Sequence, residues 1–549
     1  MTPESHAPTG TDGLPSGPPP GCPAHGLGPG GLHRLHEAED LGALYEQLRD
    51  QHGPVAPVLL HDDVPMWIVL GHAENLHMVR SPSQFCRDSR IWTPLKEGLV
   101  KPDHPLMPHI AWQPIASHAE GDEHKRLRGA VMGAISTIDF RSLRRYINRS
   151  TQVIVNRFCE AGEADLVSQF TEHLPMAVMC EILGMPDEYD DRLVEAARDA
   201  LKGTETAIAS HSYVMDVLSR LTATRRAQPE EDLASYLITH PARLSDDEVR
   251  EHLRLVLFAA YEATTNLLSN VLLTVLIDPR FRAQLNGGQM TVPEAVEQSL
   301  WNEPPFSTVF AYFAKQETEL GGQRIRRGDG LLFAPLPANV DPRVRPDLKA
   351  SMQGNRSHLA FGGGPHECPG QDIGRSIADV GVDALLMRLP DVELDCDEEE
   401  LSWTASIASR HLVELPVQFA PRPPQDVKEV PHHKPVAAQR SDWQIGIAQP
   451  PATAPPVPQS QPAAAQPQPV TAKPQPVTTT PQPVTTTPQP VTATPRMVIA
   501  TPQLDTAQPR PAQAQPQPQP VPGPPQPGVA PAPRRRGVWQ RFLSWWRGY

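Results

Sequence analysis

The stretch that decides the fold is FGGGPHECPG, residues 361–370, which places one cysteine inside a run of glycines and prolines. The whole chain has six cysteines, and this one, Cys368, follows His366 by two positions. Glycine carries no side chain to pack, so a loop of this composition lets the backbone come very close to another group. The pattern therefore predicts a binding site around Cys368.

Several chemistries use a cysteine in such a loop. A zinc site needs four ligands, but only His366 and Cys368 lie near each other and no second pair follows at finger spacing. A nucleophilic cysteine needs a base and an orienting group, which nothing local supplies, although the sequence leaves this alternative open. A buried structural thiol would not need the glycines. A thiolate ligand of heme iron fits best, because glycine N–H groups can approach and hydrogen-bond the sulfur.

The composition divides the 549 residues into a globular body and a tail. About half of the 65 prolines follow residue 420, in a low-complexity segment that cannot bury enough apolar surface to fold. We predict a disordered N-terminal segment at 1–35, one body at 36–420, a Pro-rich disordered linker at 421–533 and a basic amphipathic segment at 534–549.

The charge is distributed unevenly between these parts. The tail after residue 420 holds 12 Lys and Arg against 4 Asp and Glu, which leaves −22 on the body of a chain whose net charge is −14. An acidic body argues against nucleic-acid binding. The sequence has no CxxC pair, no apolar leader at its start and no long uncharged apolar run. These features predict a cytoplasmic protein with free thiols.

The hydrophobic patterns indicate a mainly α body with a small β portion (α+β), the two interleaved along the chain. LGALYEQLRDQHG has a helical period, and the stretches PVAPVLL and MWIVLG read as a strand pair. Helical periods dominate 120–280, short strands follow at 305–335, and a further helix is expected at 372–388.

One helix is exceptionally long. It opens with Ser245 and Glu248 at capping-box spacing and ends before Pro279, a rod of about 48 Å. Its middle is apolar on nearly every face, yet it also carries Glu262, Thr264, Thr265 and Asn266. Two interpretations stay open, a partly exposed helix with a polar stripe and a central helix whose polar kink lines a cavity.

Taken together, Phe361-x-x-Gly364-x-His366-x-Cys368-x-Gly370 resembles the heme-binding loop of cytochrome P450, with all five fixed positions present. His124 and Arg128 match the HxxxR motif of that family. The resemblance runs from about residue 40 to 420 and is of the soluble actinobacterial type. It implies the cytochrome P450 fold, with a long central helix over the heme and a cysteine ligand loop.

The resemblance also implies roles for individual residues. Cys368 would bind the iron of heme b (iron protoporphyrin IX), and Phe361 would pack near its sulfur. The other expected cofactor-binding residues are His124, Arg128 and His366 at the propionates, Gly364 and Gly370 in the loop, and Ala260 in place of the usual glycine of the central helix. Arg375 stands where bacterial members carry arginine.

The central helix departs from the family at its acid–alcohol pair. Glu262 supplies the acid, but Ala263 replaces the alcohol, and Thr264 follows one position later. One step along a helix rotates a side chain by about 100°, so Thr264 cannot simply substitute. The candidate catalytic residues are therefore Glu262, and Thr264 if the helix is locally distorted, with ordered water or a substrate hydroxyl as further proton sources.

The Glu-x-x-Arg motif of the family is also incomplete. Glu297 is present, but Leu300 occupies the arginine position and Trp301 follows. An arginine that binds a propionate is replaced by Tyr312. Replacing a buried ionic set by apolar packing can be neutral. We therefore expect a clamp rebuilt from hydrophobic contacts, with Arg356 or solvent as the partner of Glu297.

The tail repeats PQPV at Pro467, Pro474, Pro481 and Pro488, and its prolines exclude a coiled coil in favour of an extended spacer. The last residues form a basic amphipathic pattern, with Trp539, Phe542, Leu543 and Trp546 at i, i+3, i+4 and i+7 among arginines. This pattern suits an anionic membrane surface or an acidic partner groove, and the alternative is a disordered end that docks on the acidic body.

The resemblance implies a heme-thiolate monooxygenase that inserts one oxygen atom from O2 into a small organic substrate, with electrons from a ferredoxin and its reductase. A heme-binding sensor or scaffold with little turnover is the alternative, suggested by the altered motifs and the long tail. Peroxide-driven oxidation is a third hypothesis. The segments expected to line the pocket carry no signature that identifies the substrate.

Overall fold

The computed structural model describes residues 32–427 apart from short gaps. The gaps are 39, 103, 105, 203–204, 279–281, 283–284, 286, 289, 349, 351, 353 and 406–407. The predicted N-terminal segment lies almost entirely outside the described residues, as do nearly all of the Pro-rich linker and the whole basic C-terminal segment. At the C-terminal end of the described chain, the backbone N–H of Gln425 donates to Asn156 and Arg422 pairs with Asp391, so contacts with the body continue past residue 420.

Helices make up most of the described chain, which confirms the predicted mainly α class. They are α1 (Leu41–His52), α2 (His72–Arg80), α3 (Thr93–Lys96), α4 (Met107–Ile110), α5 (Gly121–Ile135), α6 (Phe140–Val155), α7 (His173–Leu183), α8 (Asp191–Lys202), α9 (Ala207–Ala227), α10 (Leu233–Thr239), α11 (Asp246–Ile277), α13 (Val292–Asn302), α14 (Pro335–Asn339) and α15 (Gln371–Arg388).

The strands form a five-stranded sheet and three smaller ones. The large sheet has the order β1 (Val55–Leu59), β2 (Pro65–Val69), β8 (Gly330–Phe333), β5 (Val309–Ala314) and β3 (Phe85–Cys86). The small sheets pair β6 (Thr318–Leu320) with β7 (Gln323–Ile325), β10 (Trp403–Ala405) with β11 (Arg410–Leu412), and β12 (Pro416–Gln418) with both β4 (Glu163–Asp165) and β9 (Glu393–Leu394).

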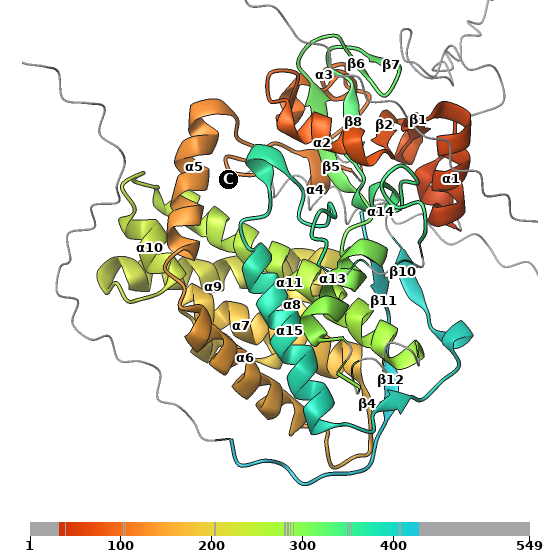
Figure 1. Cartoon of the computed structure of the whole chain (residues 1–549). Helices are drawn as coiled ribbons and strands as arrows, with labels where there is room; N and C mark the ends of the chain where they lie inside the picture. The colour runs from red at the N-terminus through yellow and green to blue at the C-terminus, as the bar shows by residue number, and fades with distance from the viewer. Residues whose placement is uncertain are drawn as a thin grey trace, which may run out of the picture. The chain divides into compact units, whose positions relative to one another are not determined.

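Among the groups of buried apolar side chains in the described residues, the two largest hold the body together. The larger one unites the helices from α5 to α11 with α15, and a second one joins α1 to the five-stranded sheet. Figure 1 shows this division, with the sheet and α1 at one end and α6, α7, α8, α9 and α15 at the other. Burial of these side chains is the main stabilising contribution to such a fold.

The predicted long helix is α11, which spans 32 residues from Asp246 to Ile277. Ser245 and Glu248 form the capping box expected from the sequence, because each side chain accepts a hydrogen bond from the other residue's backbone N–H. The helix continues without a break through Glu262 and Asn266, so the polar kink considered above is absent.

Among the described residues, α11 alone is long and apolar enough to cross a membrane, but 61% of its apolar window is buried inside the body. It packs against α7, α9, α13 and α15, and Leu253, Leu257 and Leu268 are fully buried. Both observations mark it as the core helix of the body.

The edge of the large sheet matters for the site. Strand β3 pairs with β5 in antiparallel register, with Phe85 opposite Ala314 and Cys86 opposite Phe313. The next residue, Arg87, therefore stands opposite Tyr312. Directly opposed residues of an antiparallel pair point to the same face and interact through their side chains.

Candidate functional site

The cysteine loop runs from Phe361 to the start of α15 at Gln371. The backbone N–H of Cys368 donates to the carbonyl oxygen of Phe361 at 2.8 Å, which closes the loop into a compact turn. Gly362 and Gly364 both have positive φ, at 73° and 65°, a conformation that residues with a side chain rarely adopt.

Gly364 shows what the backbone of the loop approaches. A Cβ atom at this position would lie 2.1 Å from the carbonyl oxygen of Val79, near the end of α2. A Cβ atom at Gly362 or Gly370 would meet nothing within 4 Å. The sequence predicted a close approach of the loop backbone to another group. At Gly364 that group is α2, and the contact fixes the position of the turn that precedes Cys368.

The thiol of Cys368 lies between opposing electrostatic influences. Burial raises its pKa, whereas a hydrogen bond from the backbone N–H of Gly370 and the charges of Arg128 and Arg375 act to lower it. The guanidinium of Arg375 also stacks on Phe361, with its Cζ 4.4 Å from the ring centroid. Burial is the largest of these influences and leaves the pKa of the Cys368 thiol above its ordinary value, so the neighbouring N–H and the two cations offset it only in part.

Helix α5 brings His124 and Arg128 to this loop from one helical turn. The His124 ring lies 4.2 Å from that of His366, centroid to centroid, and the guanidinium of Arg128 donates to the carbonyl oxygen of Glu367. Nε2 of His124 is buried and has no hydrogen-bond partner. Burial together with the charges of His366 and Arg128 lowers the pKa of His124 to about 4.

His366 has one acidic neighbour, Glu120, whose Oε1 lies 3.6 Å from its Nε2. The same oxygen accepts the backbone N–H of Arg87 at 2.7 Å. Burial alone would raise the pKa of Glu120, but these contacts hold it below its ordinary value. The Glu120 carboxylate thus joins His366 to the main chain of Arg87, and the neighbouring His124 and Arg128 add further donors, an arrangement suited to binding anionic groups.

The polar residues of α11 form a second group with β11. Glu262 and Asn266 lie one turn apart on α11, and Ser409 and His411 face them from β11 and the residue before it. The Ser409 hydroxyl is 3.4 Å from Oε1 of Glu262 and 2.8 Å from Nε2 of His411. Nδ1 of His411 lies 2.7 Å from Oδ1 of Asn266, whose Nδ2 donates to the carbonyl oxygen of Pro305.

Thr264 lies apart from this group. Positions 262 and 264 are about 200° apart around a helix, so their side chains point in nearly opposite directions. The hydroxyl of Thr264 is buried and turned toward α15, 3.9 Å from where a Cβ atom of Gly374 would be. Ala260 is half-buried against the helical core. Within the described residues, no hydrogen bond or ion pair joins Glu262, Thr264 or Ala260 to the cysteine loop.

The expected hydrophobic clamp is only half right. Leu300 and Trp301 are fully buried as predicted, but Glu297 keeps charged partners. Its carboxylate lies 2.6 Å from Nε of Arg375, 3.0 Å from Nε2 of His358 and 3.4 Å from Nε of Arg356. Arg356 was expected, whereas Arg375 and His358 supply the larger part of the pairing. Burial alone would raise the pKa of Glu297, but hydrogen bonds from His358 and Arg375 hold it at about 2.

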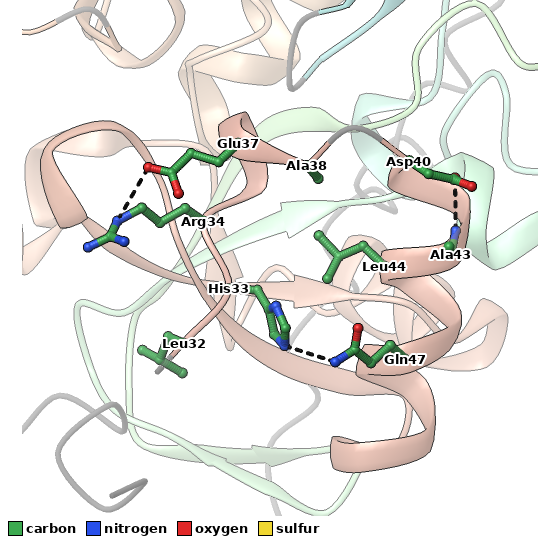
Figure 2. Close-up of a pocket in the computed structure, with 9 residues that line it drawn as sticks. All are labelled: Leu32, His33, Arg34, Glu37, Ala38, Asp40, Ala43, Leu44 and Gln47. Atoms are coloured by element: carbon green, nitrogen blue, oxygen red, sulfur yellow. Dashed lines mark hydrogen bonds and ion pairs between the residues drawn. The ribbon is translucent and has the colours of Figure 1, made fainter. Parts of the chain in front are cut away.

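A pocket of about 430 Å³ lies elsewhere, at the start of the described chain (Figure 2). Its walls come from α1 and the segment before it, and Figure 2 shows His33 beside Gln47 and Asp40 capping the N–H of Ala43. It is lined by Leu32, His33, Arg34, Glu37, Ala38, Asp40, Ala43, Leu44 and Gln47. None of these residues belongs to the predicted site.

Several contributors to the site escaped the sequence reasoning, among them Glu120, Ser409, His411 and Arg87. Ser409 and His411 lie just before and in β11, and His411 is 145 residues from its partner Asn266 along the chain. The alternating pattern of SRHL is the one local feature that indicates a strand there. Arg87 follows a short strand in which Cys86 pairs with Phe313, 227 positions along the chain, a pairing that periodicity cannot reveal.

The residues around Cys368 fit a group that combines a metal with two carboxylates. The thiol suits iron, while the buried, unpartnered Nε2 of His124 and the guanidinium of Arg128, which donates only to a carbonyl, suit the carboxylates. A cysteine loop that leads into α15, which packs on the buried α11 in a mainly α body with a small sheet portion, is the arrangement expected of the class of heme-thiolate proteins.

No protein-family model matches the sequence, but individual relatives do. The chain is 31% identical to the mycinamicin IV hydroxylase/epoxidase of Micromonospora griseorubida, over 72% of this chain and 96% of the relative. It is 30% identical to the cytochrome P450 monooxygenase PikC of Streptomyces venezuelae, over 69% and 94%. The solved structure of CYP154C4 from Streptomyces sp. W2061 superposes with a TM-score of 0.65 at 25% identity, over 70% and 97%.

The chain therefore belongs to the cytochrome P450 family. It is an oxidoreductase of the monooxygenase type, and the family implies a heme-thiolate cofactor. The predicted family and fold are confirmed, including the long central helix and the cysteine loop.

Proposed function

We propose that this P450 inserts one oxygen atom from O2 into a small organic substrate, with Cys368 as the iron ligand of heme b. The observation that carries the proposal is the environment of the Cys368 sulfur, which meets the N–H of Gly370 and the charges of Arg128 and Arg375. When bound, the heme-thiolate supplies dioxygen activation, because electron donation from sulfur favours cleavage of the O–O bond.

The surrounding residues bind and orient this group. His124, Arg128 and His366 supply donors for its carboxylates, and the contact between Arg128 and the carbonyl of Glu367 ties these donors to the loop. Phe361, held under the guanidinium of Arg375, covers the loop next to the sulfur and keeps water from it. Gly364, with its positive φ, keeps the backbone in the required turn, and the N–H of Gly370 donates to the sulfur.

Glu262 holds the proton that the reaction consumes, and the Ser409–His411 pair connects it to solvent. The Nδ2 of Asn266 is committed to Pro305, so Oδ1 of Asn266 accepts from Nδ1–H of His411. In neutral His411, Nε2 then accepts from the Ser409 hydroxyl. A proton that arrives at His411 passes along this chain when Nε2–H donates to Ser409 and the hydroxyl turns to donate to Glu262. This reversal moves a proton from His411, whose side chain is 26% exposed, toward the carboxylate.

The family and the charge of the chain suggest the partners that we propose. A ferredoxin and its reductase would deliver electrons, and relatives named as hydroxylases support a small-molecule substrate. We place the protein in the cytoplasm, with its basic C-terminal segment as a docking element for an anionic membrane surface or an acidic partner. That segment lies outside the described residues.

The experiment that tests the proposal is turnover of the full-length protein with a ferredoxin, its reductase and a panel of small molecules. Mass spectrometry should detect products that carry one atom of 18O from labelled dioxygen. A sensor remains the second candidate because Ala263 replaces the usual alcohol. Tight binding across the panel, without labelled product, would favour the sensor.

A further inference from the structure

Arg87 is a cation that the roles assigned so far do not use. It follows β3 and, by the register of that strand, stands opposite Tyr312 on β5. Its guanidinium lies over the Tyr312 ring, with Cζ 5.2 Å from the centroid. Tyr312 is buried, and it occupies the position where the resemblance leads us to expect an arginine. The cross-strand neighbour therefore brings a guanidinium to the place where the chain lacks one.

The guanidinium of Arg87 has little to neutralise it. One terminal nitrogen donates to the carbonyl oxygen of Phe310 at 2.8 Å, and Nε is buried without a hydrogen-bond partner. Among the residues that the structure describes, no carboxylate lies within ion-pair distance of it. By contrast, nearby Arg90 is paired with Asp88 at 2.8 Å. A partly desolvated cation without an anion is costly unless a ligand supplies one.

The backbone of Arg87 is tied to the cysteine loop. Its N–H donates to Oε1 of Glu120, and the same oxygen faces Nε2 of His366. Glu120 thus engages the main chain of Arg87 and leaves its side-chain charge unpaired. Glu120 thereby holds Arg87 and His366 next to each other as one pair of hydrogen-bond donors. His124 and Arg128 form a second pair on α5.

We propose that Arg87 binds one of the two propionate carboxylates of the heme, in place of the arginine missing at position 312. The inference rests on the proposed heme function. The Tyr312 side chain holds the guanidinium from one side and forms a hydrogen bond with it, and the carbonyl of Phe310 orients it, so that the donors not used by these two groups are left for a planar carboxylate.

The test compares heme loss from the full-length protein and its variants to an excess of apomyoglobin, followed at the Soret band. Arg87→Gln should lose heme about tenfold faster than the natural chain, the effect expected for one hydrogen bond to a charged group. Arg87→Gln combined with Tyr312→Arg should recover most of the loss. Arg90→Gln is the matched control and should leave the rate unchanged.

A second measurement separates direct binding from a structural effect. Each protein is reconstituted with heme dimethyl ester, which has no carboxylates. The difference between Arg87→Gln and the natural chain should vanish with this ester, and Arg87→Lys should lie between them with ordinary heme.

The proposal is overturned if Arg87→Gln releases ordinary heme at the natural rate while Arg128→Gln releases it faster. It is also overturned if Arg87→Gln accelerates the loss of the ester equally, since that result indicates distortion of the fold. A natural chain that binds heme without a thiolate spectrum contradicts the proposed function instead, so the two failures are distinguishable.

Discussion

Gly364 is the residue at which the backbone of the cysteine loop is most tightly constrained. Its φ of 65° is unfavourable for a residue with a side chain, and a Cβ atom would overlap the carbonyl of Val79. Gly362 has a similar φ of 73° but open space around it. A substitution at Gly362 therefore adds backbone strain alone, whereas the same substitution at Gly364 adds both strain and a clash with α2.

Gly364→Ala should destabilise the protein by more than Gly362→Ala and lower its heme content. Backbone strain alone costs about 1–3 kcal/mol at either position, and the clash with α2 adds to it only at Gly364. Chemical denaturation and the ratio of Soret to protein absorbance would measure both effects. Equal losses in the two variants would contradict the contact between the loop and α2.

Glu262→Gln should reduce the fraction of electrons that appear in product by about tenfold or more, because an amide cannot hold the relayed proton. His411→Gln should do the same, because it removes the residue that passes the proton to Ser409 in the proposed relay. The measurement is product formed against reduced cofactor consumed, across a pH series. Thr274→Val, on the same helix but bonded only to its own turn, serves as the control. Unchanged coupling in Glu262→Gln would exclude the relay.

At the scale of elements, helices α13 and α15 are joined by an ion pair. Glu297 of α13 pairs with Arg375 of α15 and with His358, which lies in the segment before the cysteine loop. The side chain of Glu297 is only 9% exposed. The pKa of Glu297 is about 2, below its ordinary value of 4.5. The pairing therefore contributes its full stability at pH values above 4.5. This stability is lost as the pH falls from about 5 toward 2.

Glu297→Gln should therefore lower the free energy of unfolding by about 3 kcal/mol near neutral pH, with a difference that shrinks as the pH falls toward 2. Urea denaturation at several pH values would measure it. Glu319→Gln, an exposed carboxylate on β6, should show almost no change at any pH. A difference that grows with acidity would contradict the assigned pairing.

The elements that the sequence predicted best are those whose signals are local. The capping box at Ser245 located the start of α11, and the alternating stretches located β1 and β2. The partners of Glu297 and of Tyr312 could not be read from the sequence in this way. Arg375 lies 78 residues from Glu297, and Arg87 meets Tyr312 only through the register of β3 on β5. Long-range pairings of this kind depend on the packed fold.

At the scale of the whole molecule, we propose separate tasks for the acidic body, which would hold the heme, and the basic tail, which would dock. A chain truncated after Val427 should keep its heme spectrum and its thermal unfolding within error, since the body contains every residue of the site. The full-length chain should bind vesicles rich in anionic lipid more tightly than the truncated chain, with a difference that salt reduces. Equal vesicle binding by both chains would exclude a membrane role for the basic C-terminal segment.

The central claim is that Cys368 binds heme iron as a thiolate. The most direct test is the carbon monoxide difference spectrum of the reduced full-length protein beside that of Cys368→Ala. The natural chain should show the red-shifted Soret band of a heme-thiolate, and the variant should lose that band while retaining its helical circular dichroism. A histidine-type band in the natural chain, or an unchanged band in the variant, would contradict the assignment.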